Sequence, residues 1–274
     1  MQLEDWDSDL KAFSEVVQQQ PDEAEAWANV AAVHMHNKHP AEAYPALVES
    51  LKQNRNNWRV WVSKLYTCLD LEKYDEAVQS CTMLLDLKGN HAVRALEEKC
   101  VRAIVGGILS RYEQAKIDQY HAALQVHRRS LNRLHALLER LCVSSSCDPW
   151  VYETLAYFHQ TVGQDDEEVA DYLLREYRSL LSVKGWEKDD GQVSKMYQVV
   201  RQIVHYQQGS KEQLIKSKFL LKSVLKKVEQ SRCDTDHDHR LGRMRMSSTN
   251  GHDDRVVISH TNAILVGLKN MAEE

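Results

Sequence analysis

The sequence has few residues that break helices and no segment that suits a membrane. Its 274 residues include only four prolines and ten glycines, and alternation of apolar and polar residues is scarce, so a β-sheet protein is not expected. No run of about eighteen apolar residues occurs, which predicts no transmembrane helix. The first residues, MQLEDWDSDLK, are acidic and lack the apolar stretch of a secretory signal. These absences favour an all-α protein of the cytoplasm or the nucleus.

The chemical signatures of common enzymes are missing as well. The sequence contains no GxxxxGK(S/T), GxSxG, HExxH or GxGxxG motif, and we predict a non-catalytic protein without a cofactor. The six cysteines form no CxxC pair, which indicates reduced, packed thiols. The histidines at 34, 36 and 39 do not share a helix face, and the histidine-rich segment 236–239 lies in a polar insert that fixes no geometry. We therefore predict no metal site.

What the sequence does contain is a repeat with a period of 34 residues. Trp27 and Trp61 are 34 residues apart, and so are Ala43 and Ala77. This period is typical of tetratricopeptide repeats, in which each copy is one helix–turn–helix hairpin. Tyr74 precedes Ala77 in the second helix of its copy and supplies an aromatic side chain there. We predict that these five residues form the structural core of the repeat, because periodic apolar positions mark a buried face.

The repeat is regular in only part of the chain, and this predicts three regions. Residues 1–88 are expected to hold a half-repeat and two full repeats, and residues 89–209 a divergent helical array. Residues 210–274 are expected to form capping helices around a disordered insert at 231–252. The predicted fold is an all-α solenoid of tetratricopeptide type, with helical hairpins in a right-handed superhelix and divergent C-terminal helices.

Three local features refine this division. Pro21 ends a second helix that has no first helix before it, so we expect a shortened or partial chain. The pair Gly106–Gly107 is expected to interrupt a helix at 91–109. A long amphipathic helix is expected at 111–142, with one apolar stripe at Leu124, Leu131, Leu134, Leu138 and Leu141. A degenerate copy of the repeat is expected to begin at Trp150.

The first helices of the repeats carry candidate partner-binding residues. Some tetratricopeptide domains hold the terminal carboxylate of a chaperone between asparagine and basic side chains, which donate charge-assisted hydrogen bonds. In the repeat alignment, the asparagine position falls on Asn29 and one basic position on Arg59. The second basic position falls on Ser63, with Lys64 adjacent, and the remaining donors have no counterpart. We predict Asn29, Arg59 and Lys64 as polar contacts of a concave groove; the alternative is that they are ordinary solvent-exposed side chains.

Longer segments resemble the tetratricopeptide repeat protein 27 family. They are PDEAEAWANVAAVHMHN, WRVWVSKLYTCLDLEKYDEAVQSCTMLLDLK, VRAIVGGILSR and, much later, GWEKD. The resemblance implies a protein–protein interaction scaffold or co-chaperone-like adaptor that takes part in the assembly of large complexes, including ribonucleoproteins. Its expected partners are proteins such as chaperones or assembly subunits. Members of the family are much longer at the N-terminus, in keeping with a partial chain.

RNA binding is the alternative function. Lysines at 211, 216, 218, 222, 226 and 227 lie on a predicted amphipathic helix that could contact the phosphates of RNA or an anionic membrane surface. The net charge of −5 argues against a general nucleic-acid binder, and a packed helix with a solvated face explains the same pattern. Because phosphate contacts weaken steeply with salt, salt dependence would distinguish the two functions.

Overall fold

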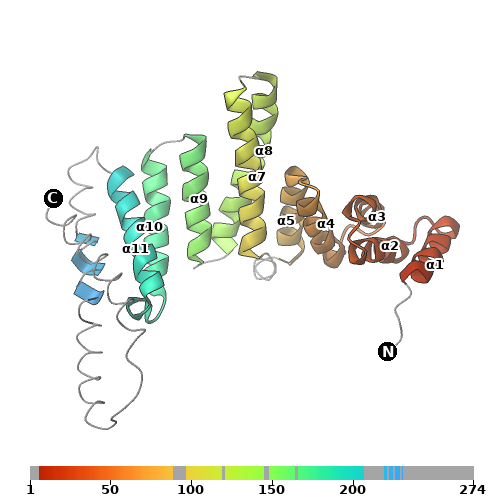
Figure 1. Cartoon of the computed structure of the whole chain (residues 1–274), viewed down its shortest axis with the longest axis horizontal. Helices are drawn as coiled ribbons and strands as arrows, with labels where there is room; N and C mark the ends of the chain where they lie inside the picture. Colours follow the sequence, from red (N-terminus) through yellow and green to blue (C-terminus); the bar gives the residue numbers. More distant parts are fainter. Residues whose placement is uncertain are drawn as a thin grey trace, which may run out of the picture. The chain divides into compact units, whose positions relative to one another are not determined.

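The computed structural model describes residues 6–88, 97–118, 121–144, 148–163, 166–206, 219–220, 222–224, 226–228 and 230. These residues are mostly helical and include no strand (Figure 1), which confirms the predicted all-α class. The elements are α1 (Trp6–Gln19), α2 (Ala24–His36), α3 (Pro40–Gln53), α4 (Trp58–Asp70), α5 (Tyr74–Lys88), α7 (Glu98–Ile117), α8 (His121–Ser144), α9 (Pro149–Val162), α10 (Asp166–Ser182), the 3₁₀ helix η1 (Trp186–Lys188) and α11 (Asp190–Tyr206).

The two full repeats have the same turn between their helices. Lys38 and Glu72, 34 residues apart, both adopt the left-handed backbone conformation, with φ of 59° and 55°. In each copy the amide of the next residue donates to the carbonyl five residues before it, over 2.8 Å. This bond closes the C-terminal end of the first helix and sends the chain into the second. The 34-residue period is therefore present in the backbone as well as in the sequence.

The tryptophans that define the repeat also form equivalent hydrogen bonds. The indole Nε1 of Trp27 donates to the Pro21 carbonyl over 2.9 Å, and that of Trp61 donates to the Arg55 carbonyl over 2.8 Å. Each bond ties a first helix to the loop that follows the preceding second helix. Trp61 is buried, whereas Trp27 is partly exposed. These side chains therefore fix how one hairpin follows the next.

The alanines of the repeat lie in its buried core. Ala43 in α3 and Ala77 in α5 are completely buried. Each helix from α1 to α5 packs on the next one in the chain, so that α2–α3 and α4–α5 form two stacked hairpins (Figure 1). A hairpin of two short helices cannot bury its apolar face alone, and stacking completes the core.

The α7–α8 hairpin continues this packing without the sequence period. Helix α7 contacts α4 and α5, and α8 contacts α5 and α7. Contacts accordingly divide the chain into the units Met1–Ser146 and Cys147–Glu274, and α7–α8 belong with the repeats. The helix predicted at 111–142 is divided in the structure, because α7 continues to Ile117 and α8 begins at His121. Its predicted apolar stripe is buried at Leu131, Leu134, Leu138 and Leu141.

The predicted interruption at Gly106–Gly107 is wrong. Helix α7 runs without a break from Glu98 to Ile117. A Cβ atom on Gly107 would lie 2.2 Å from Cζ of Tyr74, whereas a Cβ on Gly106 would meet nothing within 4 Å. Gly107 therefore allows the Tyr74 ring to approach the α7 backbone closely. The pair serves helix packing rather than helix termination.

The second unit begins where the degenerate copy was expected. Helices α9 and α10 form a hairpin, and α11 packs on α10 and on η1 (Figure 1). Lys195 of α11 lies 3.0 Å from a carboxylate oxygen of Glu153 in α9 and 3.8 Å from one of Glu176 in α10. Because Glu176 is buried, this lysine supplies the positive charge that its carboxylate requires.

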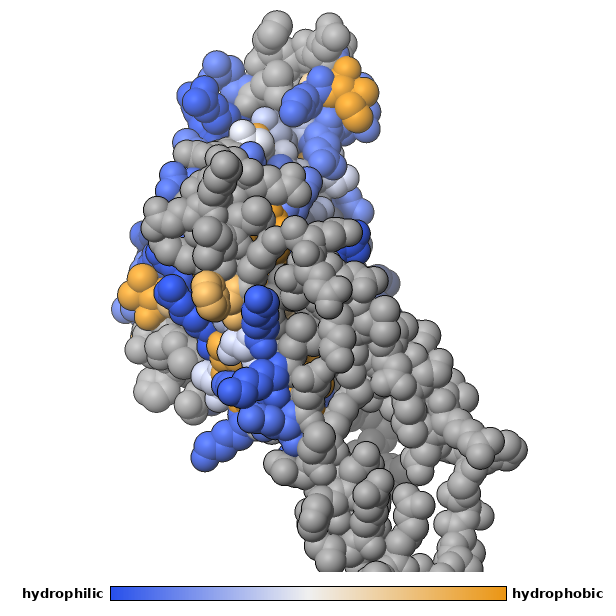
Figure 2. Space-filling model, turned by 90° about the vertical axis from the view of Figure 1, so that its left-hand side faces the viewer, coloured by the Kyte–Doolittle hydropathy of each residue, from blue (hydrophilic) through white to orange (hydrophobic). Residues whose placement is uncertain are grey.

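The described surface offers few clues to a binding site through hydropathy alone. The described residues on the face in Figure 2 are largely hydrophilic, with apolar side chains in separate places. Single exposed apolar residues are ordinary and mark no site.

None of the described helices combines the length and apolar character that a bilayer crossing requires. The predicted insert at 231–252 and the last predicted helix lie outside the described residues. The right-handed sense of the superhelix remains a prediction.

The two glycines of α7 give a matched test of this packing. We expect Gly106→Ala to raise the free energy of unfolding by about 0.5–1 kcal/mol, because alanine favours a helix and the Cβ meets open space. We expect Gly107→Ala to lower it by about 1–2 kcal/mol, because the Tyr74 ring must move. Urea unfolding followed by circular dichroism measures both. Equal stabilisation by the two substitutions would contradict the close approach.

The left-handed turn residue gives a second test. We expect Lys38→Gly to raise the free energy of unfolding by about 0.5–1 kcal/mol, because a non-glycine residue in this conformation is strained by about 1–2 kcal/mol. Lys11→Gly, within α1, should lower it by about 1 kcal/mol, because glycine disfavours a regular helix. Thermal melts of the two variants check the opposite signs. A loss of stability in both would mean that Lys38 has no strain to relieve.

Candidate partner-binding site

Arg59 lies at the start of α4 on an exposed surface. The side chain of Asn57 caps this helix by accepting a hydrogen bond from the Arg59 amide over 3.2 Å. The Arg59 guanidinium carbon is 5.6 Å from the centre of the Trp58 ring, within the range of a cation–π contact. A cation at a helix N-terminus opposes the helix dipole. An anion would be favoured there by the charge of Arg59 and by the positive end of the helix dipole.

The structure does not bring the three predicted groove residues together. Asn29 is exposed on α2, as Arg59 is on α4, and neither lines a described cavity. Lys64 lies five residues after Arg59, and therefore about 140° around the same helix. It is only 7% exposed. Lys64 therefore belongs to a different surface from Arg59.

Lys64 lines a cavity of about 430 Å³ between α3 and α4. Its ammonium nitrogen is 5.1 Å from the centre of the Trp61 ring. We call this cavity the Lys64 pocket. Two further basic side chains and one amide line it beside apolar groups, and the whole set is Val48, Leu51, Lys52, Arg55, Trp61, Lys64 and Gln79.

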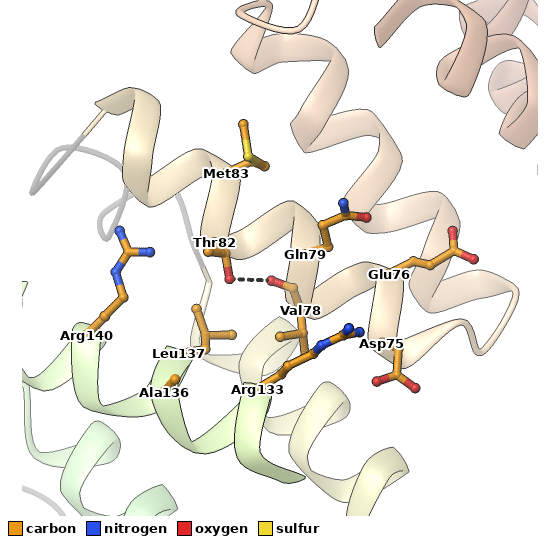
Figure 3. Close-up of a pocket in the computed structure, with 10 residues that line it drawn as sticks. All are labelled: Asp75, Glu76, Val78, Gln79, Thr82, Met83, Arg133, Ala136, Leu137 and Arg140. Carbon is orange, nitrogen blue, oxygen red and sulfur yellow. Dashed lines mark hydrogen bonds between the residues drawn. The ribbon is translucent and has the colours of Figure 1, made fainter. Parts of the chain in front are cut away.

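A second cavity, of about 480 Å³, lies between α5 and α8 (Figure 3). We call it the α5–α8 groove. Side chains of the two helices face each other across it, with buried Val78 and Leu137 among them. Thr82 satisfies its own hydroxyl by donating to the Val78 carbonyl over 2.9 Å. The lining residues are Asp75, Glu76, Val78, Gln79, Thr82, Met83, Arg133, Ala136, Leu137 and Arg140.

The two helices of the groove contribute charges of opposite sign. Asp75 and Glu76 come from the first turn of α5, where carboxylates are favoured by the helix dipole. Arg133 and Arg140 come from α8, two helical turns apart (Figure 3). Arg140 is paired with Asp86 over 2.6 Å. Among the described residues, neither Arg133 nor Asp75 has an ion-pair partner. The groove thus offers the cation of Arg133 and the carboxylates of Asp75 and Glu76 to an incoming chain.

Glu76 is held in place from the neighbouring repeat. The Tyr44 hydroxyl in α3 donates a hydrogen bond to its carboxylate. Burial, and then this hydrogen bond, raise the pKa of Tyr44 well above its ordinary value. The Lys73 ammonium lies 3.6 Å from the centre of the Tyr44 ring. The acidic end of the groove is therefore positioned by α3 and by the turn before α5.

Sequence reasoning missed the groove because its two walls are more than forty residues apart in the chain. A signal was present on each wall. The residues at 133, 136, 137 and 140 recur with the spacing of one helix face. That face lies beside the leucine stripe, which was recognised as core. No pattern in the sequence gives the register with which α8 packs against α5.

The described cysteines behave as packed thiols. Cys68, Cys81, Cys100 and Cys142 are free, and the first three are buried. Burial raises the pKa of Cys68 to about 11, so its thiol is protonated at neutral pH. No group of three potential metal ligands occurs in the part of the chain that the structure describes. The histidine-rich segment 236–239 lies outside that part.

The lysine-rich helix is described only in part. Lys222, Lys226 and Lys227 are exposed, and Val224 and Val228 are buried against the residues of α10 and α11. The described positions thus form a packed apolar face and a solvated basic face. The residues from 207 to 218, which include the first three lysines of this stretch, lie outside the described residues.

Comparisons with known proteins place the chain among helical-repeat proteins, although no family model matches it. It is 25% identical over 112 residues to a TPR repeat-containing protein of Schizosaccharomyces pombe, covering 40% of this chain and 14% of that protein. It is 25% identical over 142 residues to the tetratricopeptide repeat-containing protein trd-1 of Caenorhabditis elegans, covering 51% and 18%. The fold and the repeat geometry define the protein as a tetratricopeptide-type α-solenoid.

The particular similarity is to tetratricopeptide repeat protein 27. The homolog of that protein in Dictyostelium discoideum is 27% identical over 189 residues, which cover 68% of this chain and 21% of the relative. The resemblance predicted from sequence segments is thereby confirmed. The chain spans about a fifth, or less, of the length of these curated relatives.

Solved structures with similar backbones are distant. The crystal structure of MamA protein has 11% identity and a TM-score of 0.42, and the match covers 64% of this chain and 82% of that one. A tetratricopeptide repeat protein from Parabacteroides merdae has 11% identity and a TM-score of 0.33, with 98% and 93% covered. Similarity at this level says nothing about a shared partner.

The burial of Lys64 has a consequence for stability. We expect Lys64→Met to raise the free energy of unfolding by about 1 kcal/mol, because an apolar side chain of similar length avoids the cost of desolvating a cation. The control is Lys52→Met, which removes an exposed cation paired with Glu49 and should change stability by less than about 0.5 kcal/mol. Urea unfolding of both variants measures the two changes in the free energy of unfolding. A clear loss of stability in Lys64→Met would mean that a partner within the chain holds its charge.

Proposed function

We propose that this chain is a non-catalytic protein–protein interaction scaffold that holds a segment of a partner protein in the α5–α8 groove. The supporting observation is the groove itself, which is lined by buried Val78 and Leu137 together with Asp75 and Arg133, neither of which has an ion-pair partner among the described residues. Stacked helical hairpins present extended surfaces of this kind to other proteins. The absence of catalytic motifs from the sequence agrees with a binding role.

The size and charges of the groove favour a peptide segment. A volume of about 480 Å³ accommodates a few side chains and falls in the range of small binding sites. A bound segment would place apolar side chains over Leu137 and Val78. Its acidic group would face Arg133 and its basic group would face Asp75. Such complementary charges set the orientation of a partner and reject mismatched ones.

A second proposed contact is the exposed surface around Asn29 of α2 and Arg59 of α4, which we call the first-helix surface. Arg59 combines a guanidinium with the N-terminal end of α4, where an anion is stabilised. Asn29 supplies an exposed amide on the corresponding helix of the preceding repeat. Each is a donor for a carboxylate of the partner, as expected from its repeat position. This surface differs from the groove and is tested by different substitutions.

The finer role comes from the resemblance to the tetratricopeptide repeat protein 27 family. It is that of a co-chaperone-like adaptor, in the cytoplasm or the nucleus, that assists the assembly of large complexes including ribonucleoproteins. The proposed partners are accordingly chaperones or assembly subunits. Direct RNA binding through the exposed Lys222, Lys226 and Lys227 is the rival function.

The groove is tested by reversing one charge on α8. We expect Arg133→Glu to reduce partner binding about tenfold, a change of about 1.4 kcal/mol, because an acidic group of the partner would be repelled. Arg128→Glu makes the same charge change on the same helix, about 140° away, and should bind normally. Partners captured from a cell lysate by the wild-type chain are identified by mass spectrometry and then titrated against each variant.

The same capture separates the alternatives. Loss of partners with Asn29→Ala/Arg59→Glu, but not with Arg133→Glu, would place the contact on the first helices instead. Equal capture by all four chains would contradict both surfaces. Capture that disappears after nuclease treatment, and that falls steeply with added salt, would support RNA binding through the lysine-rich helix.

A further inference from the structure

The Lys64 pocket departs from the repeat pattern at every basic position that it contains. Lys64, Arg55 and Lys52 lie 34 residues after Val30, Pro21 and Gln18. The preceding copy therefore has neutral residues at the three places where this copy has cations. Val30 is buried, so the position of Lys64 is a core position of the repeat that tolerates an apolar side chain. A departure from the repeat pattern in one copy only indicates that this copy has a function of its own.

Two of the three cations of this pocket, Arg55 and Lys64, have no carboxylate partner within the described chain. Lys52 is paired with Glu49, its ammonium 2.6 Å from the carboxylate. Arg55 has a guanidinium nitrogen 3.8 Å from the sulfur of Met83, which is only a weak acceptor. Lys64 has no carboxylate partner among the described residues and contacts the Trp61 ring. Buried lysines are nearly always paired, so a cation more than nine-tenths buried at a cavity is unusual.

The walls of the pocket define what would fit. Val48, Leu51 and Trp61 provide apolar surface beside the cationic groups. An anionic group on a short apolar stem, such as the carboxylate of a glutamate side chain, satisfies both. The cavity is too small for a folded domain, and three basic side chains do not form the extended basic surface that a nucleic-acid backbone requires.

The pocket is also next to the α5–α8 groove. Gln79 of α5 lines both cavities, so a segment bound in the groove can reach the pocket across one helix. Gln79 is exposed, and its amide can donate a hydrogen bond to a carboxylate at this point.

We propose that the Lys64 pocket is an anion-binding site that receives an acidic side chain of the partner segment, held by Lys64 and Arg55. This inference rests on the proposed scaffold function and specifies its partner as a segment with an acidic residue beside apolar ones. The shared chemistry is an oxyanion, which a glutamate carboxylate or a phosphorylated serine can supply. Charge-assisted hydrogen bonds from a guanidinium and an ammonium suit either group.

The test selects peptides from a random octapeptide display library against the full chain. Parallel selections use Lys64→Met, Lys64→Arg and Arg128→Glu. We expect the wild-type chain and Arg128→Glu to enrich peptides with an acidic residue next to apolar residues. Lys64→Met should lose the acidic preference, and Lys64→Arg should restore most of it. Circular dichroism melts establish that each variant is folded, and Val30 in the preceding copy shows that an apolar residue suits this position.

Calorimetry on the selected peptide then measures the contact directly. Replacing its acidic residue by glutamine should weaken binding to the wild-type chain at least about tenfold, and this difference should vanish in Lys64→Met. A phosphoserine version distinguishes the two sources of the oxyanion: tighter binding than the glutamate version assigns the pocket to a phosphorylated partner, and weaker binding assigns it to an acidic one.

The possible failures are distinguishable. Enriched peptides without acidic residues, or an acidic preference that survives Lys64→Met, would overturn the anion site and leave the scaffold function intact. Selections that enrich no peptide with any chain would overturn the scaffold function itself, and the anion site with it.

Discussion

The close approach of neighbouring helices at small residues is the constraint on which the rest of this structure depends. Ala43 and Ala77 are completely buried in α3 and α5, and Gly107 plays the equivalent part in α7, where any side chain would meet the Tyr74 ring. A short hairpin exposes too much apolar surface to be stable alone, so each must come near enough to the next to exclude water. The helix faces that remain available for a partner are decided by this stacking.

The indole hydrogen bonds complete that constraint. Each ties a first helix to the loop behind it, at Pro21 in one copy and at Arg55 in the next. The second bond uses the carbonyl of Arg55 and leaves its guanidinium directed to other contacts, one of which is Met83. The same residue thus takes part in the backbone geometry of the repeat and in the Lys64 pocket. The carbonyl of Arg55 thus stabilises the repeat, and its side chain lines the Lys64 pocket.

The parts of this fold that could be predicted are those with a local or periodic cause. The period of 34 residues identified the hairpins, and the leucine stripe of α8 was recognised because 3.6-residue spacing depends on a single helix. The interruption expected at Gly106–Gly107 failed because a glycine pair has two physical uses, and only the position of Tyr74 shows which applies. The α5–α8 groove depends on the register of two distant helices, which no local pattern encodes.

Lys64 shows how the same reasoning can select an important residue for the wrong reason. In the repeat alignment a basic position falls on Ser63, and Lys64 was predicted as a contact because it is the next residue. One residue along a helix, however, is a rotation of about 100°. That rotation takes the side chain off the exposed surface of Arg59 and into a cavity beside Trp61. At such a position an apolar residue is the stable choice, and the preceding copy has one in Val30. A lysine there costs desolvation energy that packing alone does not offset, and an anion supplied from outside the chain would remove that cost at the moment of binding.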